Sequence, residues 1–584
     1  MGAGGAGRNL ARFGRTVAVL ALALAAAWMW VAARPATNRR PRADSGAPWT
    51  VPGEVVVEFR DGVDEPSMLG LARRFGASLS AAAPSSGAAR IRVLQMAPGA
   101  VAAAVARLRS DPSVAAVEPQ HLFRIPAGEV GTLAPRRVGA SAGVGRRGWR
   151  PNDPRYDEQW NFRRIDMERA WERTRGRGVT VAVIDTGVSF ENAAGGHLAR
   201  DLVRTQFVSP YDFVRRGPHP DDDNGHGTHV AGTIAQSTDN GEGVAGIAFE
   251  ASLMPLKVLS AAGGGRMSDV AAAIRYAADN GARVVNLSLG APFPDAITRR
   301  ACRYALDRGV TLVAAAGNSG EEGVSYPAAY PECIAVSAVG PSGEVAPYSS
   351  WGAPVAIAAP GGDKSGDEAG GILQNAILDG KDDYYSFQGT SMAAPHVAGV
   401  AALIVAQGVR DPAEVRATLE RSATPREPRS TYGAGELNAS AAVEAASSEA
   451  GGQRRQALIL AAIWAVAALA TRVRRRPAWG AALGATLGLL LPDVFVLFAG
   501  VGSPWNIVGH SILVPGFLYL SEAETPAEKG FFGLMSGGVA LHILEDLATG
   551  FAPPMGVPVG AALPWLWVNA VLGIGLVLAS RRAR

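Results

Sequence analysis

The chain has 584 residues, of which 48% are hydrophobic and 18% are charged. This length predicts more than one domain, and the composition excludes an intrinsically disordered chain. A net charge of +4 is small for this length, so we expect no nucleic-acid partner. Two cysteines, Cys302 and Cys333, exclude a disulfide-dense scaffold and a four-cysteine zinc site. A disulfide between them requires a geometry that the sequence does not define.

Residues 1–34 are predicted to be a signal peptide or an N-terminal membrane anchor. Arginines at positions 8, 12 and 15 precede the uncharged apolar run 17–33, which ends in small residues. The length of this run lies between that of a signal-peptide core and that of a membrane span. Both interpretations deliver the following domain outside the cytoplasm, whereas the basic flank disfavours a buried helix of a soluble domain.

Residues 52–125 have the pattern of a small α+β domain. The predicted elements, in chain order, are a strand at 55–59, a helix at 68–75, a strand at 91–94, a helix at 100–109 and a strand at 114–117. Residues 126–150 are rich in Gly, Arg and Ala without periodicity, which predicts an exposed linker.

Residues 151–447 alternate apolar strands with amphipathic helices. Strands are predicted at 179–184, 283–289 and 310–316, and helices at 268–280 and 295–308. This alternation predicts an α/β fold with a parallel sheet covered by helices on both faces. Asp185, Ser288 and Asn318 fall at the carboxyl ends of strands, where such sheets collect functional residues.

Residues 456–584 are predicted to form an all-α transmembrane bundle of about five helices. The apolar stretches lie at approximately 457–471, 479–501, 505–520, 531–549 and 559–580, and the first is short for a span. If residues 151–447 lie outside, five spans place the arginines at 472–476 and 581–584 inside, as the positive-inside rule requires.

Three motifs of the middle domain carry the residues of nucleophilic catalysis. They are Val-Ile-Asp185-Thr-Gly, Asn-Gly-His226-Gly-Thr-His and Gly-Thr-Ser391-Met-Ala-Ala-Pro-His. A serine hydroxyl needs a neighbouring base such as histidine, and a carboxylate orients the imidazole. Ser391 opens the predicted helix 392–406, whose N-terminus favours developing negative charge. Asn318, in Ala-Ala-Ala-Gly-Asn, is a candidate donor to an oxyanion.

These motifs, in the order Asp, His, Ser, resemble the subtilisin family of serine endopeptidases (subtilases) over about 150–445. The resemblance implies a triad of Asp185, His226 and Ser391, an oxyanion hole at Asn318, and an acyl-enzyme mechanism that needs no cofactor. It gives His229 and His396 packing or hydrogen-bonding roles. The alternative is an inactive fold of this family that binds peptides without turnover.

The resemblance also implies where polypeptide substrates bind. The residues that pair with the substrate backbone are then Ser288, Leu289 and Gly290. The residues that line the pocket for the side chain before the scissile bond are Ala315, Ala316 and Gly317, with Ser325 near its base. Because these residues are uncharged, we expect a preference for medium or large apolar side chains. Glu321 and Glu322 lie nearby in sequence and could alter this preference.

Residues 52–125 are similar to the inhibitory propeptide of the same family, which implies a zymogen that cleaves itself between about 119 and 150. The alternative is a permanent binding module. Subtilases often bind structural calcium through loop carboxylates, and Asp221, Asp222 and Asp223 are candidates, although an aspartate run is also typical of a solvated loop. We assign no calcium ligands.

The predicted membrane domain contains ionisable residues, which are costly at membrane depth and therefore candidates for function. His542 and Asp546 share one helix face, and with Asp493 and His510 they could form a mixed nitrogen and oxygen metal site. The pattern resembles the YdjM-like family of membrane-bound metal-dependent hydrolases over about 485–560. The alternative is a set of polar residues that hydrogen-bond one another inside the bundle.

The sequence thus predicts a membrane-tethered, extracytoplasmic serine endopeptidase made as a self-processing zymogen. Its expected partners are polypeptide substrates, its own propeptide and the lipid bilayer. A second hypothesis makes the membrane domain a metal-dependent hydrolase and the protease a device for its maturation.

Overall fold

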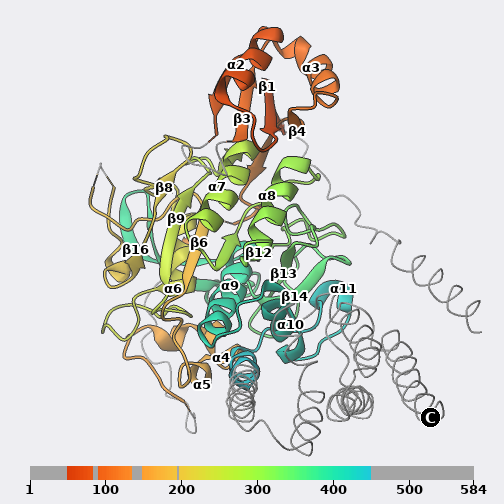
Figure 1. The fold of residues 1–584 in the computed structure, drawn as a ribbon. Coiled ribbons are helices and arrows are strands. Elements are labelled where there is room, and N and C mark those ends of the chain that lie inside the picture. Colours follow the sequence, from red (N-terminus) through yellow and green to blue (C-terminus); the bar gives the residue numbers. More distant parts are fainter. Residues whose placement is uncertain (1–48, 83–89, 130, 135–147, 194–195, 449–584) are drawn as a thin grey trace, which may run out of the picture. The chain divides into compact units, whose positions relative to one another are not determined.

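The structure is a computed structural model that describes residues 49–82, 90–129, 131–134, 148–193 and 196–448 (Figure 1). The predicted signal segment, the five apolar stretches and the candidate metal ligands Asp493, His510, His542 and Asp546 lie outside these residues. Within the described ranges, no helix combines the length and the apolar character needed to cross a bilayer.

The N-terminal α+β domain contains the predicted elements in the predicted order, with longer strands than expected and one further strand, β2, that the sequence analysis did not identify. Its elements are β1 (Thr50–Phe59), α2 (Glu65–Arg74), β2 (Ser78–Ala81), β3 (Ile91–Gln95), α3 (Val101–Leu108) and β4 (Val114–Arg124). The strands form an antiparallel sheet in the order β10-β4-β1-β3-β2. Its edge strand β10 (Gly264–Arg266) comes from the following domain, because β4 continues seven residues beyond the predicted strand.

The following domain is built on an eight-stranded parallel sheet, as the alternating pattern predicts. Its strand order is β14-β13-β12-β11-β6-β9-β7, and β8 also pairs with β9. The strands are β6 (Thr180–Asp185), β7 (Gln206–Phe207), β8 (Tyr211–Asp212), β9 (Ser252–Lys257), β11 (Val284–Leu287), β12 (Thr311–Ala315), β13 (Cys333–Val339) and β14 (Val355–Pro360).

Helices cover both faces of this sheet, and strand alternation divides the core between them (Figure 1). Along β6, Val181 and Val183 pack on the side of α6 (His226–Ala235) and α9 (Thr390–Ala406), whereas Ala182 and Ile184 pack on the side of α7 and α8. Helix α7 spans Met267–Asp279 and α8 spans Ala296–Leu306. Two buried faces explain why the strands are apolar throughout rather than alternating.

The remaining described elements are short or lie at the edge of the domain. A three-stranded sheet has the order β15-β16-β5, with β15 at Ile372–Leu378, β16 at Lys381–Phe387 and β5 at Thr132–Leu133. Further α-helices are α4 (Trp160–Arg164), α5 (Met167–Ala170), α10 (Pro412–Ser422) and α11 (Arg429–Tyr432), and residues 439–448 are also helical. The interpretation of 126–150 as an exposed linker is therefore wrong at β5, because Thr132 and Leu133 pair with Ser386 and Tyr385.

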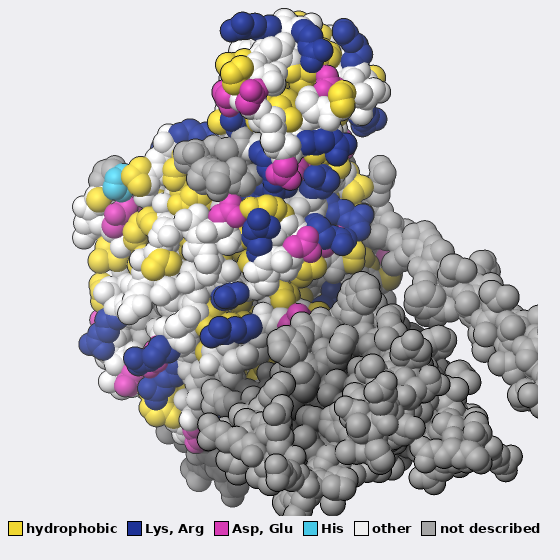
Figure 2. All heavy atoms as spheres, viewed as in Figure 1, with side chains coloured by type: hydrophobic (Ala, Val, Ile, Leu, Met, Phe, Trp, Pro, Cys, Tyr) yellow, Lys and Arg dark blue, Asp and Glu magenta, His cyan; other side chains and the backbone are white. Residues whose placement is uncertain are grey.

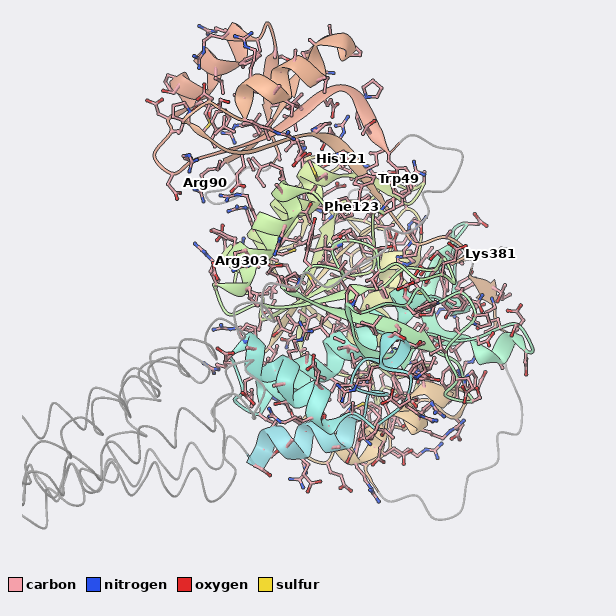
Figure 3. The ribbon with its side chains drawn as sticks, turned by 90° about the vertical axis from the view of Figure 1, so that its right-hand side faces the viewer. Trp49, Arg90, His121, Phe123, Arg303 and Lys381 are labelled. Atoms are coloured by element: carbon pink, nitrogen blue, oxygen red, sulfur yellow. The ribbon has the colours of Figure 1, made fainter. Side chains whose placement is uncertain are left out.

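The N-terminal domain rests on α7 and α8, and its core continues into the following domain (Figure 3). Val56, Ile91 and Phe123 belong to the same buried cluster as residues of α7 such as Ile274. Figure 3 labels Phe123, Trp49 and His121 where the two domains meet, and Trp49 and His121 both contact the Phe293 ring. The junction is thus an apolar interface and not a loose tether.

Buried polar contacts fix the orientation of this junction. The Glu58 carboxylate, 1% exposed, pairs with Arg275 of α7 and accepts from Arg300 Nε of α8 at 2.6 Å. Gln120 caps the N-terminus of α7, since its Oε1 accepts from the Ser268 amide at 3.2 Å and its Nε2 donates to Ser268 Oγ at 2.8 Å. Figure 2 shows basic and acidic side chains next to one another where the N-terminal domain meets the following domain.

Candidate active site

The three residues of the predicted triad come from three separate elements and meet at one edge of the sheet. Asp185 is the last residue of β6, His226 the first of α6, and Ser391 the second of α9. His226 Nδ1 lies 2.7 Å from Asp185 Oδ1, and both side chains are essentially inaccessible to solvent. The imidazole is therefore oriented by a carboxylate, as a general base requires.

Two glycines allow the helices to begin at this point. Gly225 precedes α6 with a φ of 94°, and a Cβ there would overlap the Leu378 side chain. Gly389 precedes α9, and a Cβ there would overlap the carboxylate of Glu129. The glycines of the His226 and Ser391 motifs thus permit a sharp helix start and a close approach to the site.

The second nitrogen of the imidazole contacts a residue that the sequence analysis did not identify. His226 Nε2 lies 2.8 Å from Glu129 Oε2, and the Glu129 side chain is fully buried. Ser391 Oγ donates to the Ser288 carbonyl at 3.2 Å. The structure therefore brings the predicted triad together, but a carboxylate occupies the position at which His226 would accept the Ser391 proton.

The protonation state of His226 is determined by its burial and by the two neighbouring acidic side chains, Asp185 and Glu129. Burial of the imidazole opposes the charged form, but Asp185 and then Glu129 outweigh burial through charge and hydrogen bonding. Together they raise the pKa of His226 to about 10. At neutral pH the ring is accordingly an imidazolium between two carboxylates.

The predicted oxyanion donor is also in place. Asn318 Nδ2 donates to Glu129 Oε1 at 2.7 Å, and the Ser391 amide approaches the same oxygen at 3.3 Å. The Asn318 carbonyl oxygen accepts from the Thr390 amide at 3.0 Å and from Thr390 Oγ1 at 2.8 Å. Thr390 therefore fixes the side-chain amide so that its N–H groups point into the site.

Glu129 carries no recognisable motif in the sequence. It is the only acidic residue of 126–150, a segment that contains five arginines, and this is the one signal that could have identified it. The neighbouring residues Ala127 and Gly128 are exposed, as expected of a linker, but the buried Glu129 side chain is not.

The residues before Glu129 lie along the predicted substrate cleft. Arg124 and Gly290 exchange two backbone hydrogen bonds of 3.0 and 2.9 Å, and the Ile125 amide donates to the Gly263 carbonyl at 2.9 Å. Gly290 thus pairs with an extended backbone of the N-terminal segment. The Ser288 carbonyl accepts from Ser391 Oγ, and the Leu289 side chain packs in the core.

The predicted side-chain pocket is a cavity of about 100 Å³ bounded by the cleft and the N-terminal segment. Its lining from the second domain includes Gly290, Gly317, Asn318 and Ser325, and the lining residues described include no acid. Gly317 and Ser325 line this cavity, whereas Ala315 and Ala316 do not. They point to opposite faces of the sheet and pack in its two cores.

The remaining histidines of the motifs are structural, as the resemblance implied. His229 Nε2 lies 3.0 Å from the Ile372 carbonyl, and burial lowers the pKa of His229 to about 3. His396 Nε2 lies 2.8 Å from Asn161 Nδ2, and burial lowers the pKa of His396 to about 4. Both rings are therefore neutral at the pH at which His226 is charged.

The candidate calcium ligands have partners within the protein. Asp222 Oδ2 accepts from the amide of Thr228 at 2.8 Å and Oδ1 from Thr186 Oγ1 at 2.8 Å, which braces the loop before His226. Asp223 pairs with the buried Lys257 at 2.6 Å. In the part of the chain that the structure describes, no group of three or more His, Cys, Asp or Glu residues is arranged to hold a metal.

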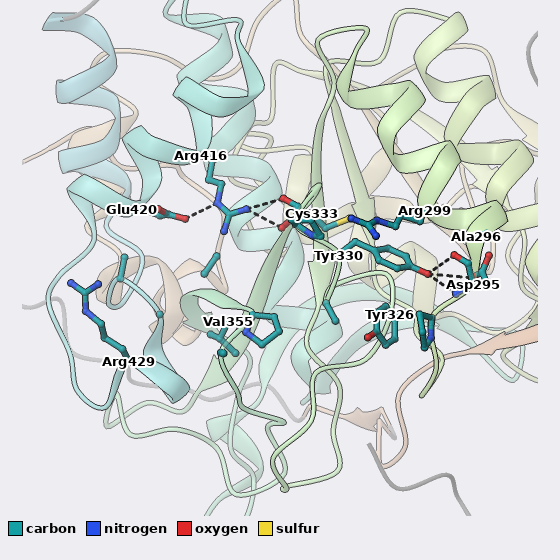
Figure 4. A pocket seen from close by; sticks show the side chains of 18 of the residues that line it. Asp295, Ala296, Arg299, Tyr326, Tyr330, Cys333, Val355, Arg416, Glu420 and Arg429 are labelled. Atoms are coloured by element: carbon teal, nitrogen blue, oxygen red, sulfur yellow. Dashed lines mark hydrogen bonds and ion pairs between the residues drawn. The ribbon is translucent and has the colours of Figure 1, made fainter. Parts of the chain in front are cut away.

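A second hollow, of about 1220 Å³, lies away from the triad (Figure 4). At one end Tyr330 and Asp295 hydrogen-bond, and Asp295 also caps the N-terminus of α8. At the other end Arg416 donates to the Cys333 carbonyl at 3.3 Å. Cys333 and Cys302 are buried free thiols with 3.9 Å between their sulfurs. This hollow holds structural contacts and brings no nucleophile and base together.

The fold and the site together are those of a serine endopeptidase of the α/β class: a parallel sheet, two helices that begin at the site, and hydrogen-bond donors that converge there. Comparison with known proteins agrees. The Subtilase family model matches residues 176–435, and the model of the fervidolysin N-terminal prodomain matches residues 38–120. The chain belongs to the subtilase family, and it is a serine endopeptidase with an N-terminal prodomain.

Several named relatives are similar to about half of this chain or more. A thermophilic serine proteinase of Bacillus sp. (strain AK1) is 35% identical over 65% of this chain and 84% of its own length. Thermitase of Thermoactinomyces vulgaris is 38% identical over 50% of this chain and 99% of its own length. Subtilisin Savinase of Lederbergia lenta is 40% identical over 48% of this chain and 97% of its own length.

Proposed function

We propose that Asp185, His226, Ser391 and Asn318 perform peptide-bond hydrolysis through an acyl-enzyme. Ser391 Oγ attacks the scissile carbonyl carbon, His226 takes the hydroxyl proton, and the same proton passes to the leaving amine when the peptide bond breaks. Water then hydrolyses the ester by the reverse sequence. No cofactor takes part in these steps, because side chains and one backbone amide supply every group.

The observation that carries this proposal is the convergence of three donors on one carboxylate. His226 Nε2, Asn318 Nδ2 and the Ser391 amide all lie within 3.3 Å of Glu129 oxygens. A tetrahedral oxyanion needs the Asn318 and Ser391 donors at that position, and the proton transfer needs the imidazole beside it. The Glu129 carboxylate thus marks the place of the reacting carbonyl.

Labelling with a fluorophosphonate probe tests the nucleophile. We expect the purified full-length protein, once processed, to label at Ser391 and to hydrolyse a casein substrate. Ser391→Ala should abolish both, whereas Ser325→Ala, which removes a hydroxyl from the neighbouring pocket, should retain labelling. A processed wild-type protein that neither labels nor hydrolyses would instead support the peptide-binding module.

We further propose that the N-terminal domain is an inhibitory propeptide and that self-processing cuts the bond between Ala127 and Gly128. The support is that the Ala127 carbonyl accepts from Asn318 Nδ2 at 3.2 Å, and that the preceding residues pair with the cleft as a substrate strand. Mass spectrometry of the N-terminus should find Gly128 first in the wild type and an uncut junction in Ser391→Ala. A first residue elsewhere would contradict this bond.

We propose a preference for apolar side chains before the scissile bond. The cavity beside Gly317 and Ser325 has no acid among its described lining residues, and an Arg or Lys side chain buried there would lack a counter-charge. Peptide substrates with Phe or Leu at this position should show a higher kcat/KM than those with Arg or Lys. The reverse order would assign Glu321 or Glu322 to the pocket.

We also propose that residues 456–584 tether the protease to the membrane, with the protease domain on the extracytoplasmic side. The support is the sequence: five apolar stretches, and arginine clusters that satisfy the positive-inside rule. The full chain should stay in the membrane fraction after an alkaline carbonate wash, and external proteinase should reach residues 151–447 in intact cells. Release by the wash would contradict the tether.

The predicted metal site of residues 456–584 and a structural calcium ion are also proposals that rest on the sequence. Metal analysis of the full chain, with and without His542→Ala, tests the site of Asp493, His510, His542 and Asp546. A metal lost on this substitution would favour the YdjM-like hydrolase hypothesis for the membrane domain. For calcium, the thermal midpoint should rise when the ion is added to chelated protein, and an unchanged midpoint would argue against a structural ion.

A further inference from the structure

Glu129 is buried against the catalytic groups although it lies in a segment of small and basic residues. Its Oε2 contacts His226 Nε2 at 2.8 Å, and its Oε1 accepts from Asn318 Nδ2 at 2.7 Å and from the Ser391 amide at 3.3 Å. Its side chain has no solvent exposure. A carboxylate this deeply buried needs charged or strong hydrogen-bonding partners, and these three groups provide them.

We propose that the active site of the proenzyme is a carboxylate-binding site whose ligand is Glu129, and that this side chain keeps the proenzyme inactive. The inference rests on the proposed catalytic roles of His226, Asn318 and Ser391. It adds an inhibitor that acts through its side chain, separate from the strand of residues 122–125 that fills the cleft.

Three requirements of the reaction are lost together while Glu129 is bound. His226 Nε2 is engaged with a carboxylate and cannot accept the Ser391 proton. One N–H of Asn318 and the Ser391 amide, which an oxyanion would need, already have an acceptor. Ser391 Oγ is turned to the Ser288 carbonyl at 3.2 Å. Glu129 must therefore leave before any peptide bond, including that of Ala127, can react.

The fold holds Glu129 in this position from both sides. Before it, residues 122–124 of β4 pair with β10, and after it Thr132 and Leu133 of β5 pair with β16. The segment between these pairings is short, so the carboxylate remains at high effective concentration over the site. Gly389 contributes as well, since any larger residue there would overlap the Glu129 carboxylate.

The test compares Glu129→Gln and Glu129→Ala with the matched control Glu321→Gln, an exposed acid of the loop that follows Asn318. The full-length protein is refolded from denaturant with the fluorophosphonate probe present, and Ser391 labelling and self-cleavage are followed in time. We expect both rates to rise about tenfold or more in the two Glu129 variants, because a charge-assisted contact is lost. Rates equal to the wild type and the control, or slower, would overturn the proposal.

A second readout is independent of catalysis and of processing. In the Ser391→Ala full-length protein, selectively labelled histidine reports the titration of His226 by NMR. Glu129→Gln keeps the size of the side chain but removes its charge, so the pKa of His226 should fall, and Glu321→Gln should leave it unchanged. An unchanged His226 pKa in Glu129→Gln would overturn the proposal, because the carboxylate would then not contact the imidazole.

The two readouts separate this inference from the proposed catalytic mechanism. If the His226 pKa falls in Glu129→Gln but no variant labels or processes, the carboxylate-binding site stands and the catalytic proposal fails. If all variants label and process at one rate, the catalytic proposal stands and the inhibitory role of Glu129 fails. Glu129→Ala guards against the case in which the Gln side chain still hydrogen-bonds the three groups and inhibits without charge.

Discussion

At the scale of single residues, the oxyanion donor is held by its neighbour in the nucleophile motif. Thr390 donates twice to the Asn318 carbonyl oxygen, and the Gly317 amide in turn donates to Thr390 Oγ1 at 3.1 Å. The side-chain amide of Asn318 therefore cannot rotate freely, and its N–H groups remain directed at the site. Preorganised donors of this kind lower the barrier because they need no reorientation during the reaction.

Removing the donor itself should slow the chemical step. We expect Asn318→Ala to lower kcat by about 10²–10³, the loss already known for this type of donor in subtilisin, with little change in KM. Steady-state kinetics of the processed enzyme on a peptide substrate measure both constants. A rise in KM without a fall in kcat would give Asn318 a binding role instead.

Removing the support of the donor should have a smaller effect. Thr390→Val keeps the shape of the side chain but loses Oγ1, so we expect kcat to fall about fivefold while KM stays within about twofold, because one hydrogen bond contributes about 1 kcal/mol. Thr174→Val, a comparable change away from the cleft, is the control. Equal kinetics in wild type and Thr390→Val would show that the Thr390 amide suffices to orient Asn318.

At the scale of elements, the propeptide is attached to the protease by a buried ion pair and a shared core. The Arg275 side chain is 3% exposed and is paired with Glu58 across the junction. Removing one partner of an ion pair buried this deeply costs much stability, because the remaining charge is neither paired nor solvated. The positions of α7 and α8 thus depend on the propeptide as well as on the parallel sheet beneath them.

Breaking this pair should destabilise the proenzyme specifically. In the Ser391→Ala background, Glu58→Ala should lower the free energy of unfolding by about 3–5 kcal/mol, because it leaves Arg275 buried and unpaired. Denaturant unfolding measures the loss. Glu65→Ala is the control, since its pair with Arg92 leaves Glu65 56% exposed and should contribute under about 1 kcal/mol. Equal losses in both variants would contradict a buried pair.

Several long elements could be predicted from the sequence, and there are physical reasons why others could not. The long apolar strand at 179–184 and the amphipathic helix at 268–280 lie within a residue of β6 and α7, because periodicity reports burial directly. The end of β4 at residues 122–124 could not be predicted, since its partner β10 lies more than a hundred residues away. Strand β5 has two residues and no periodicity at all.

At the scale of the whole molecule, the site residues that belong to sequence motifs could be predicted. The residues that reach the site only because the folded chain brings distant segments together could not. Asp185, His226, Ser391 and Asn318 stand in extended motifs, and the structure brings them together. Ala315 and Ala316 were assigned to the pocket from the family resemblance, whereas in the structure their side chains pack in the two cores on opposite faces of the sheet. Glu129 could not be assigned, because its partners come from three distant segments.

The activation of the molecule should depend on pH in a defined direction. The pKa of His226 is raised to about 10 in the proenzyme, above its ordinary value, by Asp185 and Glu129. The groups that face the ring include these two carboxylates and His229, which is neutral because its pKa is about 3. The inhibitory contact is therefore fully present below the His226 pKa of the open site and is lost as pH rises toward 10.

Processing of the refolded proenzyme should accordingly accelerate between neutral pH and pH 10. The rate of propeptide cleavage, measured at a series of pH values and divided by the activity of processed enzyme at the same pH, isolates this effect. In Glu129→Gln the ratio should vary much less with pH. A ratio that stays flat in the wild type, or that falls as pH rises, would contradict the assignment of the imidazolium to the closed state.

The pairing of β5 with β16 has a consequence for the processed enzyme. A cut after Ala127 would let the propeptide diffuse away, so that its inhibition weakens on dilution. Glu129, however, would remain as the second residue of the processed chain. It would stay close to the active site of the same molecule, because β5 remains paired with β16 of the protease domain. Inhibition by this N-terminal segment would be intramolecular and therefore independent of enzyme concentration. Full activity would require that the segment be cleaved off or displaced from the active site.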